Sequence, residues 1–204
     1  MPSEQVLRSY EDVGGAASET WERHSLPRDY LGGVLTILAS LMASLGCATI
    51  EATHGGSGYR TPGLTLGEQQ VLVGRIPDGS GDDGVIVGSG DLMTQRVRKE
   101  LLKGGLRIAS SEKSTAGELL TEASSGGIPF VLVGRIPKWV DNATEWSDKL
   151  DYSSIALELY RVTDKTLVAS SDRNVQGVTV PEDWAGWLAA AAVADILGKP
   201  APPW

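Results

Sequence analysis

One heptapeptide, Val-Leu-Val-Gly-Arg-Ile-Pro, occurs twice in the chain, at residues 71–77 and again at residues 131–137. Both copies are continuous apolar runs rich in β-branched residues, and each is closed by a proline, which cannot donate a hydrogen bond to a continuing ladder. Apolar runs without polar alternation suit strands that are covered on both faces. We therefore expect two central strands, Gln70 to Ile76 and Val131 to Pro137, with helices above and below the sheet.

The segments around the two repeats alternate between helical and strand periodicity. Apolar residues three or four positions apart predict helices, and alternating apolar and polar residues predict strands. Thr115 and Glu118 have the spacing of a capping box at the start of a helix. In chain order, the pattern predicts a helix at 91–103, a short strand at 106–109, a helix from 115, a strand near a sheet edge at 154–162, a strand at 166–175 that completes a hairpin, and a helix from 181.

This order of elements predicts a single α/β domain. Right-handed crossovers favour a mixed five-stranded sheet in the strand order 2-1-3-4-5, with helices on both faces. By analogy of fold, this arrangement is similar to the N-terminal domain of the periplasmic protein TolB and to lipoprotein activators of penicillin-binding proteins. An analogy of fold does not by itself carry a function.

An uncharged apolar run at residues 30–46 precedes the only cysteine of the chain, Cys47. The run is shorter than the roughly 20 residues that a membrane-spanning helix usually needs, and it resembles the core of a signal peptide. Residues 43–47, Ala-Ser-Leu-Gly-Cys, resemble the lipobox of bacterial lipoproteins, in which the cysteine is acylated and becomes the mature N-terminus. The alternatives are an uncleaved signal anchor and a buried cysteine that packs as a small apolar residue.

The residues ahead of this run carry several acidic side chains, whereas a signal peptide usually starts with a short basic segment. Translation that starts at Leu26 would leave a signal peptide of ordinary length. We expect residues 1–46 to be a leader and signal peptide, residues 47–69 to be the lipidated cysteine and a flexible Gly/Thr-rich tether, and residues 70–204 to be the folded domain.

The most distinctive stretch of the predicted domain follows the second repeat, at residues 138–147. Its Thr-Glu-Trp-Ser sequence, together with Gly88-Ser89-Gly90, resembles an uncharacterised family of bacterial lipoproteins over roughly residues 70–190. The resemblance implies a lipidated envelope protein and supplies no catalytic residues. The candidate binding residues of this loop are Trp139, Asp141, Asn142, Thr144, Glu145 and Trp146.

Two kinds of role fit this loop. Binding loops often follow buried strands in α/β sheets, and tryptophan is a frequent interface anchor. Alternatively, the two tryptophans cover the sheet edge while Thr144 and Glu145 form hydrogen bonds within the loop. Asp141 and Glu145 could also supply the carboxylate pair of a glycan hydrolase, although spacing in a loop does not give their separation.

Other motifs are weaker. Gly88-Ser89-Gly90 ahead of a helix could present backbone N–H groups to an anion, as in a small-ligand sensor, but a turn followed by a helix cap is the simpler interpretation. Asp82 and Asp83 fall in a Gly-rich segment that we expect to be a solvated loop rather than a metal site. Trp184 and Trp187 share the apolar stripe of the last helix, which favours a core position, and Trp204 either folds back or remains exposed.

The histidines, His24 and His54, fall outside the predicted domain, which argues against catalysis by His or Cys and against His-based zinc sites there. The net charge of -8, without a Lys/Arg cluster, argues against a nucleic-acid binder. We expect a non-catalytic interaction module without cofactor or metal, anchored to the membrane by lipid on Cys47, that binds an envelope protein or a glycan. In the resembling lipoproteins an aspartate after the cysteine can retain the protein in the inner membrane, so Ala48 favours the periplasmic face of the outer membrane.

Overall fold

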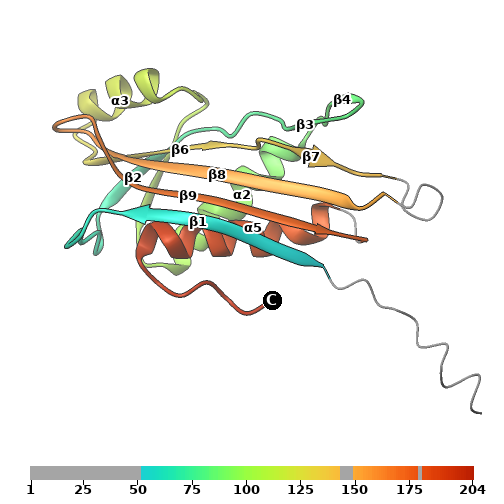
Figure 1. Cartoon of the computed structure of the whole chain (residues 1–204). Coiled ribbons are helices and arrows are strands. Elements are labelled where there is room, and N and C mark those ends of the chain that lie inside the picture. Colours follow the sequence, from blue (N-terminus) through green and yellow to red (C-terminus); the bar gives the residue numbers. More distant parts are fainter. Residues whose placement is uncertain (1–51, 143–148, 179–180) are drawn as a thin grey trace, which may run out of the picture. The chain divides into compact units, whose positions relative to one another are not determined.

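The computed structural model describes residues 52–142, 149–178 and 181–204, which belong to a compact unit extending from Thr49 to Trp204. Cys47, the predicted leader and the candidate residues Thr144, Glu145 and Trp146 lie outside the described residues. The elements, labelled as in Figure 1, are β1 (Thr53–Arg60), β2 (Gln70–Val73), β3 (Ser80–Gly81), β4 (Gly84–Val85), α2 (Ser89–Lys103), β5 (Arg107–Ser110), α3 (Ala116–Ser125), β6 (Phe130–Arg135), β7 (Trp139–Val140), β8 (Asp151–Arg161), β9 (Thr166–Gly177) and α5 (Pro181–Leu197).

The main sheet is mixed and has seven strands, in the order β1-β9-β8-β6-β2-β5, with β7 paired to β8 off this path. β2 pairs in parallel with β5 and β6, whereas the other pairings of this sheet are antiparallel. The predicted five-stranded sheet is therefore wrong in strand number and in overall order, because β1 extends the sheet beyond β9 and β7 adds a short strand beside β8. The predicted strands occupy the consecutive positions β5-β2-β6-β8-β9 within the larger sheet.

The two copies of the heptapeptide form the central parallel pair β2 and β6, one residue out of step. Val71 lies opposite Phe130, and Leu72 lies opposite Val131. Because side chains alternate between faces along a strand, corresponding residues of the two copies point to opposite faces of the sheet. Leu72 thus packs in the cluster beneath α3, whereas the corresponding Leu132 packs in the cluster beneath α2 and α5.

Helices cover both faces of the sheet, as the apolar repeats predict. α2 and α5 lie on one face and bury the larger core cluster, and α3 lies on the other face over β2 and β6 (Figure 1). Trp184 of α5 is 5% exposed within the larger cluster, which confirms its predicted core position. α3 begins one residue after Thr115, whose hydroxyl donates to the Glu118 carboxylate at 2.5 Å instead of capping a backbone N–H group.

β1 shows that the prediction of a flexible tether at residues 47–69 is wrong for residues 53–60, which form a strand. The strand pairs with β9 continuously from Thr53 opposite Gln176 to Arg60 opposite Ala169, and Leu66 beyond it is buried. Its sequence is Thr-His-Gly-Gly-Ser-Gly-Tyr-Arg, which has little apolar periodicity. The strand is held by backbone hydrogen bonds to β9, and it therefore needs few buried side chains. The folded domain therefore includes residues 53–69.

β8 also lies deeper than its sequence predicts. Its alternating pattern predicts a position near an edge, yet β9 and β1 continue the sheet on one side and β6 lies on the other. Ile155, Leu157 and Leu159 face the larger core cluster. Ala156 and Glu158, which lie between them, point to the opposite face, where they line a hollow that α3 leaves open. The alternating pattern therefore indicates one uncovered face rather than an edge position.

Candidate functional site

The predicted binding loop begins inside the core. Trp139 is fully buried, lies opposite Ser153 of β8 and packs in the larger core cluster. Among the described residues, neither its indole Nε1 nor the Ser153 hydroxyl has a hydrogen-bond partner. The structure thus corrects the prediction for Trp139, which is a core residue, because β7 pairs with β8 and turns the indole inward.

The next two residues of the loop have different surroundings. Asp141 is exposed, whereas the backbone N–H of Asn142 donates to Asp151 Oδ1 at 2.5 Å and its amide Nδ2 donates to the Leu150 carbonyl at 2.7 Å. Asp151 is 1% exposed, and burial raises the pKa of its carboxyl. Asn142 therefore closes the base of the loop through bonds within the protein. The roles of Thr144, Glu145 and Trp146 stay predictions.

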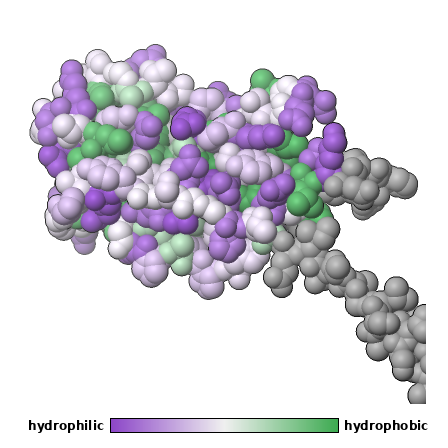
Figure 2. Space-filling model, in the orientation of Figure 1, coloured by the Kyte–Doolittle hydropathy of each residue, from purple (hydrophilic) through white to green (hydrophobic). Residues whose placement is uncertain are grey.

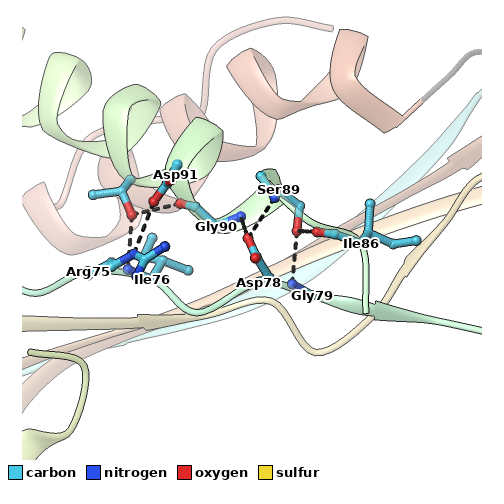
Figure 3. Close-up of polar contacts among 10 residues, drawn as sticks. Arg75, Ile76, Asp78, Gly79, Ile86, Ser89, Gly90 and Asp91 are labelled. Carbon is cyan, nitrogen blue, oxygen red and sulfur yellow. Dashed lines mark hydrogen bonds and ion pairs between the residues drawn. The ribbon is translucent and has the colours of Figure 1, made fainter. Parts of the chain in front are cut away.

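The Gly88-Ser89-Gly90 helix start already holds an anionic group of the chain itself. The Asp78 carboxylate accepts from the Gly88 N–H at 3.1 Å and from the Gly90 N–H at 2.8 Å (Figure 3). Gly88, the N-cap, has a left-handed backbone with φ of 90° and no side chain to cap the helix. A carboxylate ten residues earlier supplies the cap, so the feature that predicted an anion site has an internal ligand.

The same contacts fix a hairpin in front of α2. β3 and β4 pair antiparallel around a turn at Asp82 and Asp83, where the sequence predicts a solvated loop. The Ser89 hydroxyl donates to the Ile86 carbonyl at 2.7 Å and accepts from the Gly79 N–H at 2.9 Å (Figure 3). The Ile86 N–H in turn donates to the Gly79 carbonyl at 2.9 Å. Both ends of the hairpin are therefore tied to the first turn of the helix.

Beneath the hairpin lies the segment that the sequence indicates for binding. A Cβ on Gly81 would lie 2.6 Å from the Trp139 carbonyl, and a Cβ on Gly79 would lie 2.5 Å from the Ile136 side chain. These glycines allow the hairpin to lie directly on β7 and the residues before it. Lys138 Nζ also lies 3.7 Å from Asp82 Oδ1. The Lys-Trp segment thus supports the hairpin.

The hairpin presents two apolar side chains to solvent. Val85 is 66% exposed and Val87 is 88% exposed, whereas Ile86 between them packs partly against the core. Most of the face seen in Figure 2 is hydrophilic or intermediate, with apolar residues in separate patches. Scattered single apolar residues are ordinary on a surface, but these two lie close together in a loop that hydrogen bonds hold in place. We use the name hairpin tip for Val85, at the end of β4, together with Val87, in the turn between β4 and α2.

Sequence reasoning missed the hairpin tip. The available signal was Gly-Asp-Asp-Gly followed by Val-Ile-Val, a turn with a β-branched run beside it. Period two places Val85 and Val87 on one face and Ile86 on the other, but it does not say which face is buried. The Ser89 bonds, together with the packing of Ile86, decide that Ile86 turns inward.

A polar hollow lies on the open face of the sheet. It has a volume of about 240 Å³, and its lining includes Tyr59, Arg135, Glu158 and Asp172. The Tyr160 hydroxyl donates to Glu158 at 2.7 Å, and this bond, with burial and the adjacent negative charge, raises the pKa of Tyr160 to about 12. One carboxylate oxygen of Glu158 therefore already accepts a hydrogen bond from within the protein.

An aromatic cluster forms where the C-terminal tail returns to α5. The His54 ring lies 4.9 Å from Trp187 and 5.4 Å from Trp204, and the two tryptophan rings are 4.9 Å apart. Trp204 therefore folds back, with 53% of its surface exposed. His54 belongs to β1, which corrects its predicted position in a tether and removes one argument against histidine chemistry in the domain.

The described ranges contain neither a cluster of metal-binding side chains nor a helix that could span a membrane. No group of three or more His, Cys, Asp or Glu residues in residues 52–142, 149–178 and 181–204 could hold a metal ion. In the same ranges, no helix combines the length and apolar character needed to cross a membrane.

No protein-family model and no curated protein matches the sequence. The solved structures that are similar to it include the PelC dodecamer from Paraburkholderia phytofirmans, with a TM-score of 0.54 and 19% identity over 71% of this chain and 98% of that one. A variant of the same PelC has a TM-score of 0.55 and 19% identity over 72% of this chain and 100% of that one. Lipoprotein GNA1162 from Neisseria meningitidis has a TM-score of 0.46 and 12% identity over 64% of this chain and 99% of that one. The PelC likeness shows the fold alone, and the resemblance to the family with the Thr-Glu-Trp-Ser signature stays a prediction.

Proposed function

We propose that this chain is a lipid-anchored protein of the bacterial envelope whose α/β domain is a non-catalytic interaction module. The anchor is supported by the sequence, in which Cys47 directly follows an apolar run that ends in small residues. The domain adds a constraint, because β1 begins at Thr53. The six Cα-to-Cα steps from Cys47 to Thr53 can span at most about 22 Å, so the lipid would hold the domain close to the bilayer surface.

The observation that carries the interaction role is the hairpin tip. Val87 is the most exposed large apolar side chain among the described residues, at 88%, and the bonds of Ser89 and Asp78 hold its loop in place. A loop that is ordered before binding loses little conformational entropy when it meets a partner. A preorganised apolar tip therefore favours a protein partner over a small polar ligand.

We propose further copies of this chain as the partner. PelC, which shares the fold, forms a dodecamer. A head-to-tail assembly of identical copies needs a heterologous contact, in which one surface of a copy meets a different surface of the next copy. The exposed hairpin tip suits such a contact when its complement is a recess rather than another tip.

The alternative functions have less support. The small-ligand sensor depends on free N–H groups at Gly88 and Gly90, and both donate to Asp78. The carboxylate hydrolase depends on Asp141 with Glu145, and the second of these lies outside the described residues. Membership of the family with the Thr-Glu-Trp-Ser signature, the likeness to TolB and the position at the outer membrane are parts of our proposal that need independent tests.

The anchor is tested by metabolic labelling of cells with a fatty-acid analogue. We expect the full chain to be labelled and to sediment with membranes, and Cys47→Ser to lose both properties. Ser44→Leu is the matched control, because it alters the same segment and keeps the cysteine, so its labelling should persist. Unchanged labelling in Cys47→Ser would contradict the lipoprotein proposal.

A further inference from the structure

A second apolar feature lies at the far end of α2 from the hairpin tip. It is a groove of about 210 Å³ between the C-terminal ends of α2 and α5. Ala190, Ala194, Leu197 and Pro200 supply apolar surface, and Glu100, Lys103 and Lys199 supply charge of both signs. Leu197 is only partly buried against the core. The groove therefore offers aliphatic contacts to a side chain that enters from outside. We call it the α2–α5 groove.

The tip and the groove of one molecule cannot meet. α2 has 15 residues, so its two ends are about 22 Å apart. In Figure 1 the β3–β4 hairpin lies beside the start of α2, and α5 ends on the opposite side of the domain. If the tip fills such a groove, the groove must belong to another molecule.

The charges around the two surfaces are complementary. Asp82 and Asp83 form the turn of the hairpin, and Asp82 lies near Lys138. At the groove, Lys103 is paired with Glu100 at 2.6 Å. Asp83 and Lys199 are both exposed, and neither forms an ion pair within the part of the chain that the structure describes. One copy thus offers a carboxylate beside its tip, and the next offers an ammonium group beside its groove.

We propose that the hairpin tip of one copy docks into the α2–α5 groove of the next, with Val87 in the groove and Asp83 beside Lys199. The inference rests on the proposed interaction role and names the surfaces that would perform it. Because the two surfaces differ and lie at opposite ends of α2, each copy joins its neighbours head to tail. Repetition of this contact builds a ring if it closes and a filament if it does not.

The test is the molar mass of the full chain, purified from membranes in a mild detergent and measured by light scattering after size exclusion. We expect the wild-type chain to form an assembly of many copies. Val87→Asp, which puts a charge into the apolar contact, should weaken assembly by about tenfold or more. Leu167→Asp is the control, because Leu167 is 39% exposed in β9 and belongs to neither surface, so it should leave the mass unchanged. A monomeric wild-type chain, or Val87→Asp with the wild-type mass, would overturn the proposal.

A charge exchange identifies the groove as the partner of the tip. Asp83→Lys alone and Lys199→Glu alone should each reduce assembly, and the double variant should regain most of it, because the attraction is restored with reversed signs. Absence of recovery would also overturn the inference. Fatty-acid labelling of the same variants keeps the two proposals separate. A tip variant that loses assembly but keeps its fatty-acid label supports the contact between copies and leaves the anchor intact. Persistent labelling of Cys47→Ser contradicts only the lipid anchor.

Discussion

Arg173 on β9 binds Asp195 on α5 through two hydrogen bonds, from Nε to Oδ2 at 2.8 Å and from Nη2 to Oδ1 at 2.6 Å. The Ser171 hydroxyl donates a third bond to Oδ2 at 2.7 Å. The side chains of the pair are only 18% and 14% exposed. The hydrogen bond to Asp195 raises the pKa of the Arg173 guanidinium above its ordinary value, so Arg173 stays protonated in the pair. It connects the last helix to the sheet.

Arg173→Met should lower the free energy of unfolding by about 2 kcal/mol, because it leaves Asp195 partly buried without its cation. Arg161 and Asp164 provide the control, since that pair is 39% and 44% exposed. Arg161→Met should change stability by no more than about 0.5 kcal/mol. Urea unfolding of both variants measures the difference. Equal losses would show that burial of the Arg173 pair adds nothing.

Gly56 allows β1 to pair closely with β9 beside this ion pair. Its φ is +147°, and a Cβ there would lie 2.2 Å from the Asp172 carbonyl and 2.6 Å from the Arg173 side chain. Gly56→Ala should therefore destabilise the domain by about 2 kcal/mol or more and speed amide exchange in β1. Gly186→Ala is the opposite case, because its Cβ would meet nothing within 4 Å inside α5. That variant should gain about 0.5–1 kcal/mol through helix propensity.

The sequence predicts the strands that are recognised by what they bury. β2, β6 and β8 carry apolar residues toward one or both helical layers, so their positions follow from hydrophobic pattern. β1 could not be found in this way. Its residues 53–60 are held by backbone pairing to β9, and its glycines are required by neighbours that are distant in sequence. A flexible tether and a glycine-rich edge strand have similar compositions.

The candidate site shows a similar limit. Trp139 and Trp204 both lie in short segments whose sequence shows neither helical nor strand periodicity. Trp139 is nevertheless fully buried, whereas Trp204 is 53% exposed. The pairing of β7 with β8 decides the first, and the contact of the tail with His54 and Trp187 decides the second. Long-range pairing of this kind leaves no local signal. The binding role of Trp146 in the same loop as Trp139 stays a prediction, because this residue lies outside the described residues.

Substitutions of Trp139 measure how much packing, as distinct from hydrogen bonding, this side chain contributes to stability. Because Nε1 has no partner among the described residues, Trp139→Phe loses only volume and should cost about 1–2 kcal/mol. Trp139→Ala should cost about 3–5 kcal/mol, since it leaves a cavity beneath the hairpin. Thermal unfolding compares the two variants. A Phe variant as unstable as the Ala variant would indicate a bond from Nε1 that matters to the fold.

Asp151 gives the domain a testable dependence on pH. Burial raises the pKa of Asp151 in the folded state, so the folded chain holds this proton more tightly than the unfolded chain. Its contribution to stability is fully present below the ordinary pKa of aspartate and is lost as the pH rises through the raised value. Asp151→Asn should therefore be more stable than wild type near pH 7, with the difference shrinking toward pH 4. A constant difference in urea unfolding across this range would contradict the assignment.

Asp164 should respond in the opposite direction. The hydrogen bond from the Thr166 hydroxyl is the main cause that lowers the pKa of Asp164, and this turn carboxylate is exposed. Its contribution is present above the ordinary aspartate pKa and is lost as the pH falls through the lowered value. Asp164→Asn is thus the matched control for Asp151→Asn in the same pH series.

Asp78 should control both the start of α2 and the order of the hairpin. Asp78→Ala leaves the Gly88 and Gly90 N–H groups without their acceptor, which should cost about 1 kcal/mol and speed the exchange of both amides. Asp91→Ala is the control. Asp91 lies in the first turn of α2, but its carboxylate pairs at the surface with Arg75, at 3.0 Å, and does not cap the helix. Asp78→Asn keeps an acceptor oxygen and should retain most of the protection. If Asp78→Ala and Asp91→Ala behave alike, general charge at the helix N-terminus, rather than the specific cap, orders this end of the domain.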